Sequence, residues 1–466
     1  MWSLPRPGAG DGRLARVDPR RQRPDERERA VGPGRELRVG RDAAGPARGG
    51  RSAPAAGEES ARPRVPGGWL DRPVTGLATM IRRCGPVRTA AVAAASLAAT
   101  GAVSSPAAAA ASPAAQARQV AEVARAAMAD LRLAGLIVRV DRGRRNVATV
   151  ALGQSMTGVP VTPDMRFRIG SESIPMLTTV LLQLQEEGRL DLDDPLAKHL
   201  PDSGVPNADR VTLRMLGHSI SGYPDWIQGN PAFVDLLLAN PFRLWSEQEL
   251  LDHAFAQPLV CEPGTCFHYA HTNFLLLGRV IRAVTGRPFA AVVRERVLRP
   301  LRLGQTTITR TARMPEPVLH AYGTDRGPYE DTSFWSPSWG LGNGQLMVST
   351  VRDVARAARG VLGGRLVSRA SERELVQRLP VAQAPLPGVG FGLGVVLAGD
   401  WRVQNPYVNN YAGVMAYLPA QRLSVAIVST RAIDADFDGG NPSEAVLARL
   451  ARALAPGHPM PLGGGI

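Results

Sequence analysis

A serine stands at the start of a long amphipathic segment, where its hydroxyl could act as a nucleophile. The stretch FRIGSESIPMLTTVLLQLQEEGRLDLDDPLAKHLP begins at Phe167 and places Ser171 directly after a glycine. Its apolar residues recur with helical spacing at Ile174, Leu177, Leu181 and Leu184. The hydroxyl and N–H of Ser171 are therefore expected at a helix N-terminus, where an oxyanion is stabilised. Taken alone, the pattern also fits a serine that only caps the helix.

No competing catalytic or metal motif stands out in the sequence. It contains neither a Gly-x-Ser-x-Gly elbow nor a His-Glu-x-x-His pair. The acidic text DLDDP lacks the twelve-residue spacing of a calcium loop, and two cysteines are too few ligands for a zinc site. We therefore expect no bound metal and no cofactor.

Two cysteines, Cys261 and Cys266, lie in the text CEPGTC. The Pro-Gly pair between them can turn the chain back, so a disulfide is predicted if the protein is exported to an oxidising compartment. Two free buried thiols are the alternative.

The positive charge is concentrated at the N-terminal end of the chain. The 466 residues carry a formal net charge of +14, with 55 Lys plus Arg against 41 Asp plus Glu. Residues 1–79 hold sixteen arginines and ten acidic residues, and residues 80–117 add three arginines. Subtracting these leaves 36 basic and 31 acidic residues, or +5, for residues 118–466. This balance argues against nucleic-acid binding.

The N-terminal part of the chain divides into two segments of different composition. Residues 1–79 are rich in Arg, Gly and Pro without apolar periodicity, so we expect a disordered extension, which could be an artefact of the gene model. From Met80 a short basic stretch, an apolar run and small residues near Ala117 predict a signal peptide over residues 80–117. An uncleaved Ala-rich helix is the alternative. The apolar run is short for a membrane span, so the mature protein is expected to be secreted or held in the cell envelope without a stable span.

Residues 118–466 form the predicted catalytic domain, which is expected to have two lobes. AQARQVAEVARAAMADLRLAG predicts a helix ending at Gly135, and LIVRVDRGRRNVATVALG predicts a hairpin. Residues from about 174 to 330 have helix and loop character. Strand patterns return in FGLGVVLAGDWRVQ, GVMAYLP and LSVAIVST, followed by a last helix, PSEAVLARLARALA. We predict an α/β (α+β) fold, in which both ends of the domain build one antiparallel sheet flanked by helices and the middle forms a mostly helical lobe.

Several segments, in order, resemble a known family. FRIGS…LLQLQEEGRLDLDDPLAKHLPD, VTLRMLGHSISGYPDW, PGTCFHYAHTNFLLLGRVIRAVTGRPF and AYLPAQRLSVAIVST are similar to the serine β-lactamase and D-alanyl-D-alanine carboxypeptidase family, of the class C type with its esterase relatives. The resemblance covers residues from about 160 to 455. It implies the β-lactamase/transpeptidase-like fold, with a pocket between the lobes and a serine nucleophile.

The three motifs that the resemblance implies are all altered here. The Ser-x-x-Lys motif reads Ser171-Glu172-Ser173-Ile174, so its lysine is missing. Tyr-x-Asn reads Tyr269-Ala270-His271. The Lys-Thr-Gly or His-Thr-Gly motif falls on Gln404-Asn405-Pro406, and the N–H of Tyr407 could still serve an oxyanion hole. The histidine of the family's His-Thr-Ser-Gly turn is replaced by Ser219.

Loss of the lysine removes the expected proton acceptor of the serine. A serine hydroxyl needs a neighbouring base, and an ordinary tyrosine is protonated at neutral pH. His271 could replace the base, with Ser171 as its partner and Tyr269 beside it, or it could only hydrogen-bond within its loop. Two functions follow from the resemblance. One is ester or amide hydrolysis through Ser171 on a small molecule or cell-wall peptide, with weak or no β-lactam turnover. The other is an inactive relative that binds a cell-wall peptide, a glycan or a protein.

Overall fold

The computed structural model describes residues 112–309, 311–341, 346–382, 386–433, 435 and 440–463. The predicted N-terminal extension and most of the predicted signal peptide lie outside these ranges. The described residues all belong to one unit, Pro63–Ile466. No helix among them is long and apolar enough to cross a membrane.

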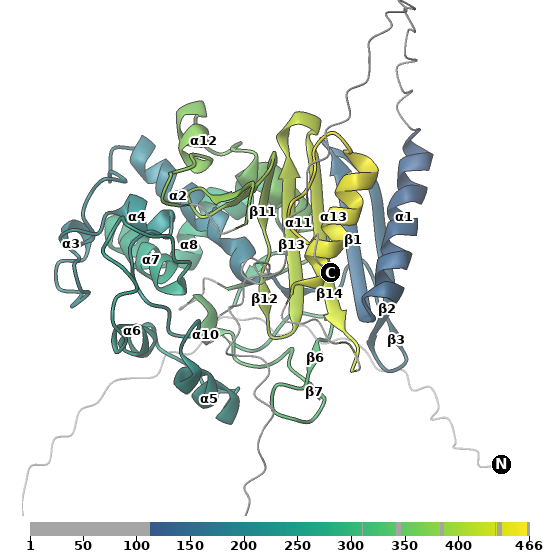
Figure 1. Ribbon diagram of the computed structural model, residues 1–466, viewed down its shortest axis with the longest axis horizontal. Coiled ribbons are helices and arrows are strands. Elements are labelled where there is room, and N and C mark those ends of the chain that lie inside the picture. The colour runs from purple at the N-terminus through teal and green to yellow at the C-terminus, as the bar shows by residue number, and fades with distance from the viewer. Residues whose placement is uncertain are drawn as a thin grey trace, which may run out of the picture. The chain divides into compact units, whose positions relative to one another are not determined.

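An antiparallel sheet built from both ends of the domain forms the centre of the fold (Figure 1). Its strands follow the order β3-β2-β1-β14-β13-β11-β10-β9, and β12 pairs with β13 at the side of this path. The strands of this sheet are β1 (Leu133–Arg142), β2 (Arg145–Met156), β3 (Val159–Pro160), β9 (Val389–Phe391), β10 (Val396–Ala398), β11 (Trp401–Gln404), β12 (Tyr407–Val408), β13 (Tyr411–Leu418) and β14 (Leu423–Arg431). The predicted union of the two ends is confirmed by the pairing of β1 with β14.

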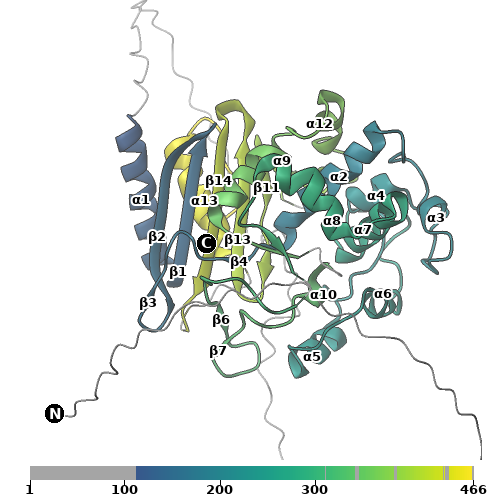
Figure 2. The ribbon, with the colours of Figure 1, turned by 180° about the vertical axis from the view of Figure 1, so that it is seen from behind.

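Helices cover both faces of this sheet (Figures 1 and 2). One face carries α1 (Pro113–Asp130) and α13 (Pro442–Leu454), which share an apolar core with the strands. The other carries α11 (Val351–Ala357), and a second core extends from there into the helical lobe. Because both of its faces are covered, every residue of β13 is buried, which explains its nearly continuous apolar sequence.

The helical lobe is made from the middle of the chain. Its helices are α2 (Ile174–Glu186), α3 (Leu196–His199), α4 (Leu213–Gly217), α5 (Pro231–Ala239), α6 (Glu247–Phe255), α7 (His271–Thr285), α8 (Phe289–Val293), α9 (Arg299–Leu301) and α10 (Ser338–Leu341). Short strands connect it to the sheet region: β4 (Phe167–Arg168), β5 (Thr307–Ile308), β6 (Tyr322–Gly323), β7 (Glu330–Asp331) and β8 (Met347–Ser349). The remaining helical segments are η1 (Gly170–Ser173), η2 (Arg294–Leu298), η3 (Ala358–Leu362), α12 (Arg369–Leu375) and η4 (Pro419–Gln421).

The predicted end of the first helix is wrong. The helix was expected to run to Gly135, but α1 ends at Asp130 and Gly135 lies within β1. Arg132 adopts a φ of 47°, which turns the chain from the helix into the strand. Gly135 is instead a close-contact position, because a methyl group added there would lie 3.0 Å from the Oγ1 of Thr430.

Candidate active site

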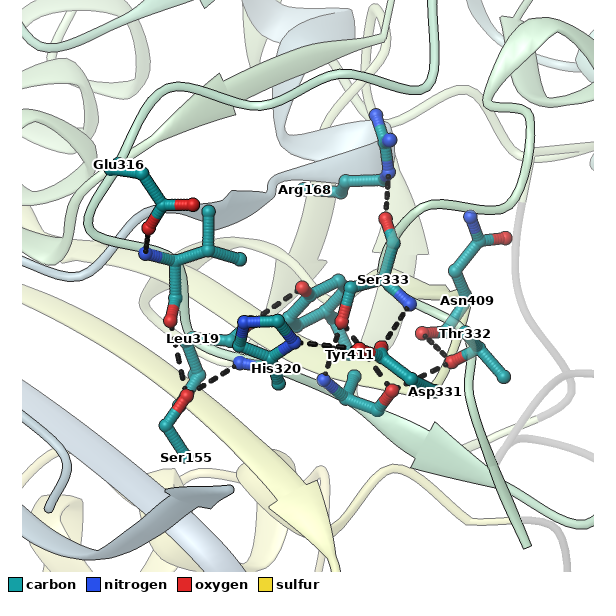
Figure 3. A network of polar contacts seen from close by, with 12 residues as sticks. Ser155, Arg168, Glu316, Leu319, His320, Asp331, Thr332, Ser333, Asn409 and Tyr411 are labelled. Atoms are coloured by element: carbon teal, nitrogen blue, oxygen red, sulfur yellow. Dashed lines mark hydrogen bonds and ion pairs between the residues drawn. The ribbon is translucent and has the colours of Figure 1, made fainter. Parts of the chain in front are cut away.

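Strand β4, which leads into the turn that carries Ser171, takes part in a largely buried polar network (Figure 3). Arg168, in β4, donates from Nε to the carbonyl oxygen of Ser333 over 3.1 Å and from Nη2 to that of Ala312 over 2.6 Å. Burial lowers the pKa of Arg168 to about 10, while Tyr411 acts in the opposite direction. Arg168 therefore stays charged at neutral pH and fixes the strand that leads into the turn.

The same network joins the segment 319–333 to the central sheet. The hydroxyl of Tyr411 donates to the carbonyl oxygen of Leu319 over 2.5 Å, and Thr332 donates to that of Asn409 over 2.9 Å. His320 and Asp331 pair over 2.6 Å at its edge (Figure 3). These hydrogen bonds hold β4, the segment 319–333 and the start of β13 in one arrangement.

Ser171 lies in η1, one turn before α2, and is partly exposed. Its side chain lies close enough to the hydroxyl of Tyr269 to lower the pKa of that group. The structure thus brings together two residues that are 98 positions apart, as the resemblance implied. Burial raises the pKa of Tyr269, and the negative charge of Asp225 raises it further, whereas the side chain of Ser171 lowers it. Tyr269 is therefore protonated at neutral pH and cannot by itself accept the proton of Ser171.

His271 is paired with an acid that the sequence analysis did not single out. Nδ1 of His271 lies 2.7 Å from Oδ2 of Asp225, and the backbone N–H of His271 donates to the same oxygen over 2.7 Å. Burial alone would raise the pKa of Asp225, but the charge of His271 and several hydrogen bonds hold it below its usual value. Since Asp225 is ionised, Nδ1 of His271 is the donor, which leaves Nε2 as the acceptor in the neutral ring.

The His271 ring also packs against the tyrosine that lies beside Ser171. The ring centroids of Tyr269 and His271 are 5.4 Å apart, with an interplanar angle of 79°. Trp226 lies on another side of the imidazole, with its centroid at 5.8 Å. Ser171, Tyr269, His271 and Asp225 therefore form a connected group in which the acid fixes the tautomer of the base. The acid could have been found in the motif Gly-Tyr-Pro-Asp, which matches the family's turn.

The position of the missing lysine is apolar. Ile174 begins α2 and is only 1% exposed. A methyl group added at Gly394, in the loop between β9 and β10, would lie 2.7 Å from the Cγ2 of Ile174. The apolar side chain of Ile174 therefore fills space in which a charged group would need contact with water or with an oppositely charged partner.

The third altered motif lies beside the Ser171 turn. A methyl group added at Gly170 would lie 2.6 Å from Cβ of Pro406, so the proline packs directly on the glycine that precedes the serine. Gly170 also has a φ of 48°, a conformation that favours glycine. The alignment of Pro406 with the third motif is consistent with this contact.

The three predicted pocket side chains all bond to the protein itself. Gln404 is buried and donates to the carbonyl oxygen of Gly394 over 2.6 Å. Asn405 donates to Glu444 of α13, and the hydroxyl of Tyr407 donates to Asn410 over 3.0 Å. Their contact with a substrate remains a prediction.

A buried glutamate follows the candidate nucleophile and was not predicted. Glu172 is fully buried, and neither of its carboxyl oxygens has a hydrogen-bond partner among the described residues. Its Oε1 would lie 3.0 Å from a methyl group added at Gly413 of β13. Burial raises the pKa of Glu172 well above its ordinary value, so the carboxyl is uncharged.

The structure joins Cys261 to Cys266 through a disulfide with an S–S distance of 1.99 Å. The bridge closes the loop that precedes Tyr269. The carbonyl oxygen of Cys261 lies so close to Gly222 that an added methyl group would be 2.0 Å from it. The bridged loop therefore packs on the turn that leads to Asp225.

Residues 120–449 match the Beta-lactamase family. The chain belongs to this family of serine hydrolases, which includes penicillin-binding proteins. Penicillin-binding protein 4 of Amycolatopsis lactamdurans is 29% identical over 266 residues, which cover 53% of this chain and 65% of that protein. The carboxypeptidase/endopeptidase AmpH of Escherichia coli is 25% identical over 303 residues, which cover 60% of this chain and 75% of that protein.

The structural likeness covers the described domain. A D-stereospecific amidohydrolase from Streptomyces sp. aligns with a TM-score of 0.63 at 28% identity, over 73% of this chain and 99% of that one. A D-amino acid amidase from Ochrobactrum anthropi aligns with a TM-score of 0.64 at 22% identity, which shows the fold. The chain spans 65% and 50% of the lengths of two curated relatives, the penicillin-binding protein 4 and PbpX of Bacillus subtilis. The predicted family and fold class are confirmed.

Proposed function

We propose that this member of the β-lactamase family hydrolyses an ester or amide through Ser171, with a substitute base and weak or no β-lactam turnover. The observation that carries the proposal is the connected group of Ser171, Tyr269, His271 and Asp225. It retains a nucleophile at a helix N-terminus and supplies a histidine oriented by a buried acid, which is the arrangement an activated serine requires.

In the proposed reaction, Oγ of Ser171 attacks the carbonyl carbon of the substrate. The proton of Ser171 passes to the Tyr269 oxygen as the proton of Tyr269 passes to Nε2 of His271. Asp225 stabilises the imidazolium that forms. Return of this proton to the leaving alcohol or amine breaks the ester or amide bond and leaves an acyl-serine. Water then attacks the acyl-serine and delivers its proton along the same route, which regenerates Ser171 and releases the acid.

The residues at two motif positions, Ile174 and Pro406, support the expectation that β-lactams are hydrolysed slowly or not at all. Ile174 provides no positive charge beside Tyr269, and Pro406 provides no N–H where the third motif lines the family's pocket. A positioned general base typically contributes about 10²–10⁴ in rate. A D-configured amide or short cell-wall peptide is a suitable first class of substrate to test, given the structural likeness to the Streptomyces amidohydrolase.

The apolar burial of Ile174 also favours a second candidate function. A chain that has replaced its charged base by a packed isoleucine can keep a binding pocket after catalysis is lost. In this case the protein would bind a cell-wall peptide, a glycan or a protein partner without turning it over.

Active-site labelling and ester hydrolysis separate the two functions. Wild-type protein should react with a fluorophosphonate probe and hydrolyse a small aryl ester, and Ser171→Ala should abolish both. Ser368→Ala, at the cap of α12, is the control serine and should retain both. Wild-type protein that neither reacts with the probe nor hydrolyses the ester, yet binds D-configured peptide, would establish the binding function instead.

Three further variants test the proton route. His271→Ala and Asp225→Asn should each lower kcat by about 10²-fold or more, because the base or its orientation is lost. Tyr269→Phe should lower it as strongly if the tyrosine carries the proton. Full activity in Tyr269→Phe with loss in His271→Ala would show that the histidine accepts the proton directly.

We also propose that the protein is exported by the signal beginning at Met80. The basic and apolar text after this residue supports the proposal, and the Cys261–Cys266 bridge is compatible with an oxidising compartment. N-terminal sequencing of secreted protein should give a first residue near 108–118. A secreted chain that begins at Met1 would contradict both the signal and the start site.

A further inference from the structure

A strongly cationic cavity lies outside the candidate active site. It has a volume of about 390 Å³ and shares no lining residue with the Ser171 group. Its walls come from β1, the β1–β2 turn, α9, α11 and the segment around η3. Six arginines line it, Arg139, Arg144, Arg302, Arg356, Arg359 and Arg365.

The lining charge is far above the average of the folded chain. Six arginines and one acid, Asp141, give the cavity wall a formal charge of +5. The whole of residues 118–466 carries only +5. The remainder of the domain is therefore close to neutral, so the abundance of arginine in this sequence does not by itself account for the cluster. Separate segments of the chain bring the charges to one place.

Most of this charge is not neutralised within the protein. Asp141 is committed to Arg139, with which it forms an ion pair of 3.0 Å. Among the described residues, the side chains of Arg144, Arg302 and Arg365 have no hydrogen-bond or ion-pair partner. Nη1 of Arg356 donates to the carbonyl oxygen of Arg302 over 3.2 Å, and its nearest acid is Asp353 at 3.9 Å.

Arg359 lies among these charges. Its Nη1 donates to the carbonyl oxygen of Gly143, while its Nε is buried without a partner among the described residues. Burial lowers the pKa of Arg359, and the neighbouring charges of Arg365, Arg144 and Arg356 add to this effect while Asp141 opposes it. The guanidinium groups are therefore close enough to repel one another, and an anion placed between them would relieve the repulsion.

We propose that this cavity binds a small anion carrying two or more phosphate groups. Guanidinium groups bind phosphate oxygens through paired, charge-assisted hydrogen bonds, and arginine is preferred wherever this geometry is needed. A single phosphate would engage only some of the six arginines. The volume lies within the range of small-molecule sites, so a pyrophosphate- or polyphosphate-bearing ligand matches both its size and its charge.

Calorimetric titration of the full chain with sodium tripolyphosphate at 0.15 M salt tests the proposal. Wild-type protein should bind one equivalent. Arg144→Glu combined with Arg365→Glu should weaken binding by at least about tenfold, because two exposed phosphate partners become repulsive. The matched control is Arg118→Glu combined with Arg125→Glu on the exposed side of α1, which makes the same change in net charge and should leave binding within about twofold.

Two further ligands identify the source and the specificity of the anion. Citrate should bind much more weakly than tripolyphosphate, and equal binding would overturn the preference for phosphate. Sedimentation with vesicles that contain cardiolipin, whose headgroup carries two phosphates, distinguishes a lipid headgroup from a free polyphosphate, and either source supports the site if the cavity variant alone loses it. The proposal fails if wild-type protein binds neither tripolyphosphate nor vesicles. It also fails if the cavity and control variants are weakened equally.

Discussion

At the scale of single residues, Ile174 occupies the position where the Ser-x-x-Lys motif of the resemblance has a lysine. Ile174 is packed against the Gly394 loop, and the amide of Gln404 is bonded to the carbonyl of Gly394. An ammonium group placed here would enter a space that Ile174 now fills away from water. We therefore expect that a single reversal at Ile174 does not restore the proton network that the resemblance implies.

Ile174→Lys should lower the free energy of unfolding by about 3 kcal/mol or more and give no efficient cephalosporin turnover, because a charge is placed where Ile174 is buried away from water. Ile174→Met keeps the volume and should cost less than about 1.5 kcal/mol. Urea denaturation and a chromogenic cephalosporin measure the two effects. A stable Ile174→Lys variant with turnover that disappears on Ser171→Ala would show that only the lysine was missing.

Glu172 raises a different question, because a buried carboxyl without a partner destabilises the folded state. Glu172→Met fills a similar volume without the polar atoms and should raise the free energy of unfolding at pH 7 by about 1–3 kcal/mol. Glu444→Met, compared at pH 4 where Glu444 is protonated, is the matched control, since it removes the partner of Asn405 and should be destabilising. Both are measured by denaturant unfolding. A less stable Glu172→Met variant would mean that the carboxyl has a partner in solution, such as water.

The sequence predicted which residues form the candidate site better than how their side chains are oriented. Motif order brought Ser171 and Tyr269 together, and it assigned Pro406 to the third motif, which the structure places against Gly170. The bond between His271 and Asp225 joins residues 46 positions apart, so no local pattern reveals it. Glu172 lies between two serines and would be expected at the surface from the local sequence. Its burial depends on the distant strand β13.

At the scale of elements, the Ser171 turn depends on close packing between β4, η1 and β12. Gly170 carries both a positive φ and the contact with Pro406, whereas Gly188, after α2, has a φ of 68° and no atom within 4 Å of an added methyl group. The two glycines therefore separate the cost of backbone strain from the cost of the contact. The turn can relieve this contact only by moving Ser171 or the β12 segment.

Gly170→Ala should lower the free energy of unfolding by about 3 kcal/mol or more, since strain and overpacking act together. Gly188→Ala should cost only about 1–2 kcal/mol from the backbone. Aryl ester hydrolysis should fall in Gly170→Ala and remain unchanged in Gly188→Ala, because only the former displaces the nucleophile. Equal stability losses in both variants would show that the Pro406 contact relaxes without cost.

Element order was predicted more successfully than element ends. Apolar strand text identified β13 and β14, and the strand patterns at both ends of the domain predicted that these strands join the first hairpin in one sheet. The end of α1 was missed because Arg132 takes a left-handed conformation usually associated with glycine, while Gly135 continues into a strand. Local propensity predicted that Gly135 ends the helix, whereas in the structure the chain turns at Arg132.

At the scale of the whole molecule, α13 is attached to the sheet through a polar contact that depends on pH. Glu444 is buried and accepts a hydrogen bond from Asn405, whose backbone carbonyl accepts one from Asn441 over 3.1 Å. Burial raises the pKa of Glu444 to about 7, although the Asn405 hydrogen bond partly opposes this. In the unfolded chain a glutamate titrates near pH ~4.3.

Between these two pH values the folded protein holds a proton that the unfolded chain has released. The free energy of unfolding therefore falls as the pH rises through this range, and the contribution of a protonated Glu444 is complete only below pH ~4.3. Glu444→Gln keeps an acceptor for Asn405 and cannot ionise. Relative to wild type, this variant should be more stable by about 1 kcal/mol at pH 5 and by about 3.5 kcal/mol at pH 9.

Urea unfolding of wild type and Glu444→Gln at pH 5, 6, 7, 8 and 9 measures this difference. Glu249→Gln is the matched control, because hydrogen bonds from Ser246 lower the pKa of Glu249 to about 2 and its titration lies below this range. Its difference from wild type should be constant from pH 5 to 9. A constant difference for Glu444→Gln as well would mean that water or movement of α13 solvates the carboxylate, so that the attachment of α13 to the sheet is insensitive to pH.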